Sequence, residues 1–315
     1  MNMKALVTGG AGFIGSTLVD RLLRDGWSVD VIDNLSTGKL ANLANARASF
    51  QGNVRFHRFD IRSSELIGVI EKAAPDVIFH LAAQVDVRIS VNDPLLDAQI
   101  NVIGLLHVLE GARAAGTKKV VFSTSGGTIY GVPEQFPTDE NQPQHPISPY
   151  GVSKKAANDY LACYHELHGL EYTALAFANV FGPRQDPHGE AGVVAIFAGR
   201  LLSGDPITIF GDGKQTRDFV YVHDVVDACA RAATRGENMI INIGTGVETS
   251  VVKLHEEMAG ITRSSRPPLF APGRAGELER SCLDPTRAAV QLGWQPATPL
   301  RDGLSDTIDF FRDRG

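Results

Sequence analysis

A glycine-rich turn near the start of the chain limits the possible folds of this sequence more than any other feature. The segment "TGGAGFIGS" places Gly9, Gly12 and Gly15 three residues apart, between the apolar strand pattern "KALVTG" and the helical pattern "STLVDRLLRDG". This spacing allows a tight turn, a close backbone approach to a pyrophosphate, and tight packing of helix on strand, with the helix N-terminus facing the anion. The junction therefore predicts a dinucleotide-binding βαβ unit.

The rest of the first half extends this unit into a sheet. Strand-length apolar runs alternate with helical stretches, among them "SVDVID", "DVIFHLAA", "KKVVFSTS" and "LLDAQINVIGLLHVLEGARAAG". Such alternation predicts an α/β fold, a Rossmann-type doubly wound parallel sheet. The rhythm breaks at "FGPRQDPHGEAG". We expect a dinucleotide-binding domain in residues 1–176, with returning segments at about 219–246, and a smaller C-terminal α/β substrate domain in 177–218 and 247–315.

The composition narrows the classes of partner. The 315 residues carry a net charge of −6, which provides no basic surface for nucleic acid or anionic lipid. No apolar run approaches membrane-spanning length, and "MNMKALVTGG" lacks a signal-peptide pattern, so we expect a cytoplasmic protein without a nucleic-acid or membrane partner. Neither the nine histidines nor Cys163, Cys229 and Cys282 show the spacing of metal ligands, so we expect no metal site.

A carboxylate at the end of the second strand indicates which dinucleotide is bound. Asp33, in "VIDN", follows Gly15 at close to the usual interval for an acidic residue on the adenine ribose hydroxyls. Because Asp33 would repel a 2′-phosphate, NAD is favoured over NADP. The expected cofactor-binding residues, at the carboxyl edge of the sheet and on the following helix, are Gly9, Gly12, Phe13, Ile14, Gly15, Asp33, Asn34, Ser36, Thr37, Gly38, Asp60, Ile61, Leu81, Ala82, Ala83, Gln84, Tyr150, Lys154 and Phe177.

The segment "SPYGVSKKAAND" carries the candidate chemistry. Ser148 suits an N-cap and Pro149 the first helical position, so Tyr150 and Lys154, four residues apart, lie on one helical face. An adjacent ammonium and the positive nicotinamide ring would favour the tyrosine phenolate, which can accept a hydroxyl proton while the attached carbon gives hydride to NAD. Ser125, at the end of the strand "VVFSTS", would hydrogen-bond the substrate oxygen.

These motifs resemble those of extended short-chain dehydrogenases/reductases, specifically the UDP-glucose 4-epimerase branch. The similarity runs from Lys4 to the final helix and includes "YGVSK", "FANVFGPRQ" and "IFGDGKQTRDFVYVHDV". It implies a nucleotide-sugar-binding second domain, NAD that is regenerated each turnover, and a role in galactose metabolism. It also implies that Tyr150 is the base for the sugar 4-hydroxyl, that Lys154 lowers the pKa of Tyr150 and holds the nicotinamide ribose, and that Ser125 positions the 4-oxygen. A transient 4-keto sugar would rotate and take hydride back on its other face.

The resemblance further implies a UDP-sugar site. Asn179, Arg217 and Arg274 would hold the diphosphate, Phe210 would pack near the uracil, and Glu277 would take the position of a ribose-binding aspartate. The expected substrate-binding residues are Thr124, Ser125, Asn179, Val193, Ile209, Phe210, Arg217, Arg274, Glu277 and Ser281. A homodimer is also expected, through the apolar helices at 93–115 and 148–168.

Several alternatives remain open at this point. Thr124 could share or take the role of Ser125. Sugar 4,6-dehydratases have an Asp-Glu pair where Gly126 and Gly127 stand here, and a UDP-glucuronate 4-epimerase is a second rival. A net dehydrogenase and a non-catalytic NAD-binding sensor are others, although a sensor would be expected to lose the tyrosine, lysine or serine. Ser281 is small, which suggests that N-acetylated UDP-hexoses are also accepted.

Overall fold

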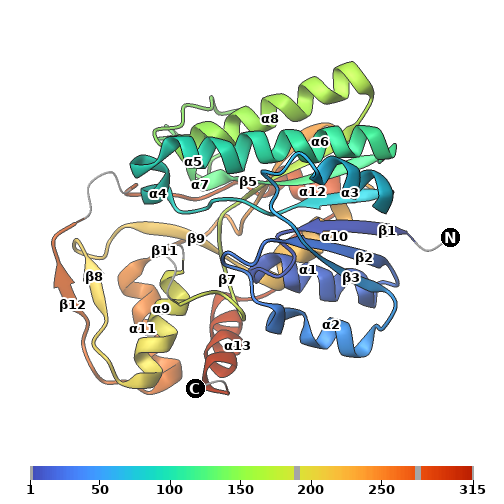
Figure 1. Ribbon diagram of the computed structural model, residues 1–315. Helices are drawn as coiled ribbons and strands as arrows, with labels where there is room; N and C mark the ends of the chain where they lie inside the picture. Colours follow the sequence, from blue (N-terminus) through green and yellow to red (C-terminus); the bar gives the residue numbers. More distant parts are fainter. Residues whose placement is uncertain (1–2, 188–191, 274–277, 314–315) are drawn as a thin grey trace.

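A seven-stranded parallel sheet forms the centre of the structure, a computed structural model that describes residues 3–187, 192–273 and 278–313. Its strand order, β10-β6-β5-β4-β1-β2-β3, is that of a doubly wound fold, which confirms the predicted class (Figure 1). The strands are β1 (Lys4–Thr8), β2 (Ser28–Asp33), β3 (Val54–Arg58), β4 (Val77–His80), β5 (Lys119–Ser125), β6 (Glu171–Phe177) and β10 (Met239–Ile243).

Helices cover both faces of this sheet because its strands are apolar on both sides. In β1, Ala5 and Val7 belong to one core cluster and Leu6 to the other, as the alternation of side chains along a strand requires. Figure 1 shows α6 and α8 on one side and α1 and α2 on the other. The helices of this half are α1 (Phe13–Arg24), α2 (Ala44–Ser49), α3 (Leu66–Ala73), α4 (Val87–Asn92), α5 (Pro94–Ala98), α6 (Gly104–Ala115), α7 (Gly126–Ile129), α8 (Pro149–His168), α10 (Val222–Ala232) and α12 (Thr286–Leu292), with a 3₁₀ turn at Leu40–Leu43 and a π-helical turn, η2 (Gln99–Ile103).

The remaining elements form a smaller region of short strands and three helices. One sheet has the order β11-β9-β7 and a second pairs β12 with β8. Through α10 and β10 the chain returns to the large sheet, whereas β9, which ends at Tyr221, pairs with β7 and β11. The elements are β7 (Asn179–Phe181), β8 (Thr208–Phe210), β9 (Thr216–Tyr221), β11 (Glu248–Ser250), β12 (Leu269–Ala271), α9 (Val193–Ser203), α11 (Val251–Thr262) and α13 (Leu300–Arg312).

The expectation that no apolar run approaches membrane-spanning length is wrong. The continuous helical stretch Pro94–Ala115 has 22 residues and is apolar enough to cross a membrane by length and composition. Its residues Leu105, Val108 and Leu109 are fully buried in the core cluster that also contains Leu66 and Ile70 of α3. A core helix meets the same criterion, so the stretch is weak evidence for a membrane span.

Candidate active site

The glycine turn connects β1, α1 and the end of β4. Gly9 has a φ of 69°, a left-handed conformation that favours glycine, and its carbonyl accepts the Gly12 amide at 3.0 Å. A Cβ on Gly15 would lie 2.1 Å from the Gly9 oxygen, and a Cβ on Gly9 would lie 2.8 Å from the Ala82 nitrogen. The turn therefore has no room for side chains at these positions, which leaves its backbone exposed to a ligand at the start of α1.

Asp33 ends β2 directly beside this turn. Its carboxylate accepts the amides of Ala11 at 3.0 Å and Leu35 at 2.8 Å, and only 8% of the residue is exposed. A carboxylate has about four acceptor positions, so two amides leave capacity for ribose hydroxyls. A Cβ on Gly38 would lie 2.8 Å from Asp33 Oδ2, so the loop after β2 closes over the carboxylate.

The other predicted cofactor residues lie where the strands end. Asp60 follows β3, accepts a hydrogen bond from the Asn34 side-chain amide at 3.1 Å and forms an ion pair with Arg62 at 2.7 Å. The Arg62 hydrogen bond is the main reason that the pKa of Asp60 is held well below its usual range. Phe177 ends β6 in register with Ser125 at the end of β5. The remaining positions are the first turn of α1 (Phe13, Ile14), the loop after β2 (Ser36, Thr37, Gly38), Ile61 after β3, and the segment after β4 (Leu81, Ala82, Ala83, Gln84).

The predicted start of α8 is confirmed, and it brings Tyr150 and Lys154 to the same edge. Ser148 caps the helix by accepting the Gly151 amide at 3.2 Å, and Pro149 occupies the first turn. Tyr150 is 8% exposed and Lys154 is 3% exposed. The Ser125 hydroxyl lies close enough to the Tyr150 phenol to lower its pKa, whereas Thr124 Oγ1 is buried and has no hydrogen-bond partner among the described residues. Ser125 is therefore the hydroxyl that shares the site with Tyr150.

The electrostatics differ from the expectation that Lys154 lowers the pKa of Tyr150. Burial raises the pKa of Tyr150, and the Ser125 hydrogen bond offsets this only in part. Lys154 Nζ lies 5.8 Å from the Tyr150 ring centroid and donates to the Ser123 carbonyl at 2.8 Å. Burial also lowers the pKa of Lys154 to about 7. The protein alone therefore holds Tyr150 in its neutral form, and a bound cation would shift it toward phenolate.

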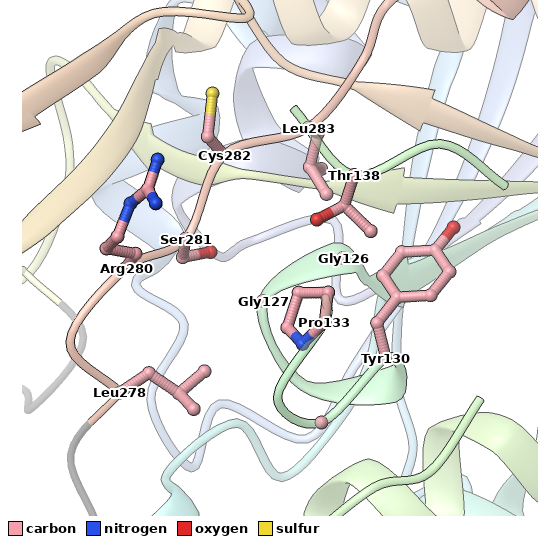
Figure 2. Close-up of a pocket in the computed structure, with 11 residues that line it drawn as sticks. Gly126, Gly127, Tyr130, Pro133, Thr138, Leu278, Arg280, Ser281, Cys282 and Leu283 are labelled. Atoms are coloured by element: carbon pink, nitrogen blue, oxygen red, sulfur yellow. The ribbon is translucent and has the colours of Figure 1, made fainter. Parts of the chain in front are cut away.

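A segment from far along the chain lies beside Gly126 and Gly127, the two residues that follow Ser125. The Ser281 amide donates to the Thr216 carbonyl at 3.2 Å, which fixes this segment beside β9. Figure 2 shows the Ser281 hydroxyl directed toward the turn at Gly126 and Gly127, and a Cβ on Gly127 would lie 3.7 Å from Ser281 Oγ. Ser281 and Gly127 thus line one small pocket together with Gly126, the residue that follows β5.

The other predicted substrate residues lie in the short strands. Asn179 begins β7 and is in register with Phe219 of β9, the strand that carries Arg217. Ile209 and Phe210 lie in β8, and Val193 begins α9. Arg274 and Glu277 lie outside the described residues. Within the described ranges, no three His, Cys, Asp or Glu side chains form a group that could hold a metal ion.

The comparisons decide the family. The family model described as GDP-mannose 4,6 dehydratase matches residues 6–307. A UDP-glucose 4-epimerase of Mycolicibacterium smegmatis is 51% identical, over 99% of each chain. A Thermotoga maritima UDP-glucose 4-epimerase with UDP-glucose superimposes with a TM-score of 0.95 at 46% identity, covering 99% of each chain. A Thermus thermophilus UDP-glucose 4-epimerase in complex with NAD gives 0.91 at 43% identity, covering 98% of this chain and 99% of that one.

The chain belongs to the UDP-glucose 4-epimerase family of extended short-chain dehydrogenases/reductases. As a member of this family it has the strand-end serine beside the buried tyrosine and lysine, at the edge where the glycine turn lies. The residues fit NAD, because the turn excludes side chains and Asp33 stands at the end of β2.

Two buried groups next to this site were not identified from the sequence. His80 ends β4; its Nδ1 lies 2.7 Å from Thr8 Oγ1, and burial lowers its pKa to about 3. Asp97 of α5 is fully buried and accepts a 2.6 Å hydrogen bond from Ser153, the neighbour of Lys154. The available signal was weak: one charged residue within an otherwise apolar helix.

Proposed function

We propose that this protein is an NAD-dependent epimerase that inverts carbon 4 of a UDP-hexose, interconverting UDP-glucose and UDP-galactose. The observation that carries the proposal is the meeting of Ser125 with the buried Tyr150 and Lys154 at the sheet edge that holds a glycine turn suited to a dinucleotide. The names of the relatives at 51% and 46% identity support it.

The side chains divide the proton chemistry among them. Bound NAD supplies the acceptor and donor for the hydride at carbon 4. Ser125 holds the 4-oxygen, and Tyr150 takes the hydroxyl proton as the 4-keto sugar forms and returns it when the alcohol is restored. Lys154 would hold the nicotinamide ribose, and the positive charge of bound NAD would favour the phenolate form of Tyr150 over the neutral form that burial favours. Inversion requires the keto sugar to turn over, so the nucleotide and diphosphate must provide most of the binding energy.

The side chains that a 4,6-dehydratase uses to eliminate water are absent beside Ser125. A 4,6-dehydratase needs an acid and a base beside the strand-end hydroxyl to remove water. Gly126 and Gly127 occupy those positions, and Leu283 fills the space beside Gly126, where a Cβ would lie 2.3 Å from Leu283 Cδ1. This arrangement favours epimerisation over dehydration.

Incubation of the purified protein with a panel of UDP-sugars, without added cofactor, tests the reaction and its substrate together. We expect UDP-glucose and UDP-galactose to interconvert on chromatography, with a deuterium label at carbon 4 retained. Accumulation of free NADH would indicate a net dehydrogenase, a 4-keto-6-deoxy product a dehydratase, and turnover of UDP-glucuronate alone a uronate epimerase. Absence of turnover with every UDP-sugar would contradict the proposal.

Acceptance of N-acetylated sugars is the finer part of this proposal. Ser281 is small and faces Gly127, so the pocket wall presents little bulk to a sugar 2-substituent. We expect UDP-N-acetylgalactosamine to be epimerised, and Ser281→Tyr to reduce its kcat/KM about tenfold or more relative to UDP-galactose. Equal losses for both sugars would contradict a size-selecting role for this position.

The same proposal includes a cytoplasmic homodimer that acts in galactose metabolism. Large apolar side chains are exposed on α4, α5 and α8, with Val91 at 60%, Leu95 at 74% and Val152 at 53%. Such a face is typical of an interface between copies. All three cysteines are free, which suits a reducing compartment. Light scattering should give a dimer mass, and Leu95→Lys should weaken the dimer; a monomeric wild-type protein would refute the dimer.

A further inference from the structure

Asp97 is a buried carboxylate to which the chemistry above assigns no task. It lies in α5, is fully buried, and accepts three side-chain hydrogen bonds. Gln84 and Asn101 each donate to Oδ1 at 2.9 Å, and Ser153 donates to Oδ2 at 2.6 Å. A fully buried carboxylate is costly unless it is paired and hydrogen-bonded, so its ionised form needs both these donors and a nearby positive charge.

The three donors come from three separate elements. Gln84 follows β4, and its backbone exchanges hydrogen bonds of 3.0 and 2.9 Å with the Asn101 side chain. Asn101 lies in the π-helical turn η2, a type of irregularity that is frequent at functional sites. Ser153 belongs to α8 and precedes Lys154. Asp97 therefore joins the segment after β4, the π-helical turn and the helix that carries the catalytic pair.

Ser153, which donates to Asp97 at 2.6 Å, directly precedes Lys154 on α8, so the charge of the carboxylate acts on the Lys154 ammonium. The negative charge of Asp97 raises the pKa of Lys154 and so opposes burial, which lowers it. The same charge raises the pKa of Tyr150 and so disfavours the phenolate. His80 faces Lys154 from β4 and is neutral at physiological pH, because burial and Lys154 itself lower its pKa to about 3. On the outer side of the network, the Asp86 carboxylate accepts the Arg88 backbone amide at 2.8 Å and lies 3.6 Å from the Arg88 guanidinium, so that pair balances its own charge.

We propose that Asp97 is a positioning residue of the epimerase reaction, whose buried carboxylate holds the start of α8, and with it the Lys154 ammonium, against the segment after β4. This proposal rests on the proposed function, because the position and charge of Lys154 matter only if it holds the nicotinamide ribose beside Tyr150. Nothing in it requires Asp97 to touch the substrate or the cofactor.

The pH dependence of kcat/KM for the NAD-loaded enzyme tests the proposal. Lys154 is charged below its pKa, so activity is lost as pH rises through that pKa. Asp97→Asn removes the negative charge, lowers the pKa of Lys154, and should move this alkaline limb about one pH unit toward acid. The pKa of Tyr150 falls as well, so an acid limb due to Tyr150 should move in the same direction.

Ser153→Ala is the matched control, since it deletes one hydrogen bond of the network and keeps the carboxylate. Both limbs of the kcat/KM pH profile of this variant should stay at the wild-type positions. The proposal is overturned if Asp97→Asn reduces activity uniformly with unmoved limbs, or if Ser153→Ala shifts them equally. Asp97→Ser also removes the charge and serves as the test variant if Asp97→Asn does not fold.

A substrate-free measurement separates this proposal from the proposed function. Competitive acylation of the protein at several pH values, read by mass spectrometry of the peptide that contains Lys154, follows the titration of that amine directly. A lower titration midpoint in Asp97→Asn supports the role of Asp97 even if no UDP-sugar is turned over. An unchanged midpoint overturns it even if the wild-type enzyme is an active epimerase.

Discussion

The two ends of the candidate site are built in different ways. At the cofactor end, backbone turns at the edge of one continuous sheet set the geometry, as at Gly9 and Gly15. At the sugar end, a buried side chain joins short segments: Asp218 of β9 accepts the Thr245 amide at 2.8 Å and hydroxyl at 2.6 Å, the Gly246 amide at 3.2 Å and the Leu283 amide at 3.3 Å.

This difference matches the division of work that epimerisation requires. Proton and hydride transfer need fixed distances, which a sheet edge provides. The sugar must turn over within its site, so its pocket needs walls that contact it without directional bonds. In the proposed function the Ser281 segment would be such a wall, and it is held by β9 and Asp218 rather than by the large sheet. Substitutions at the cofactor end should therefore reduce turnover or NAD binding, whereas substitutions at the sugar end should mainly change KM.

The largest effect is expected at the cofactor end, from Tyr150→Phe. Loss of the phenolic oxygen removes the group that exchanges the 4-hydroxyl proton, and turnover should fall about 10³-fold. Copurified NAD and the melting temperature should change little, because the ring remains in place; absorbance and calorimetry measure both. Activity within tenfold of wild type would show that another group is the base.

Gly15→Ala tests whether the backbone alone forms the dinucleotide turn. The new Cβ would lie 2.1 Å from the Gly9 oxygen and 2.8 Å from Gly10 Cα, and neither can yield without moving β1 or α1. We expect about 3 kcal/mol of destabilisation in urea unfolding and loss of copurified NAD.

Gly68→Ala in α3 is the matched control, because no atom lies within 4 Å of its added Cβ. It should be neutral or stabilise by up to about 1 kcal/mol. Normal stability and NAD content in Gly15→Ala would mean that the turn tolerates a side chain.

The same contrast explains what the sequence could and could not predict. The glycine turn, the capped start of α8 and Asp33 are each specified within a few residues, so spacing was sufficient. Asp97 and Asp218 bind donors that lie 56 and 65 residues away, Ser153 and Leu283, and no local pattern specifies such pairs. The raised pKa of Tyr150 escaped prediction for a related reason: burial by distant segments outweighs the effect of helical spacing.

A smaller effect is expected at the sugar end, from Asp218→Asn. The amide nitrogen of asparagine would face groups that themselves donate, so at least one buried donor loses its acceptor, at a cost of about 2 kcal/mol. Because the Leu283 amide is among these donors, the Ser281 wall should loosen and KM for the UDP-sugar should rise more than kcat falls.

Asp212→Asn, at a carboxylate whose side chain is 65% exposed, should leave stability and KM unchanged. If Asp218→Asn lowers kcat and leaves KM unchanged, the carboxylate serves the chemistry and the contrast between the two ends fails.

The smallest effect is the part of the pH dependence of stability that comes from His80, at the cofactor end. Burial lowers the pKa of His80 from 6.5 to about 3, so between these values the unfolded chain binds a proton that the folded chain does not. The contribution of His80 to stability should therefore fall as pH decreases below 6.5, by up to about 1.4 kcal/mol per pH unit, and should stay constant above pH 6.5. Urea unfolding at several pH values should show a shallower slope of unfolding free energy against pH in His80→Gln than in wild type.

His168→Gln, a change at an exposed histidine, is the control and should leave this slope unaltered. An equal slope in all three proteins would mean that His80 is protonated in the folded state, and that the buried edge beneath Lys154 accepts a charge more readily than its packing suggests.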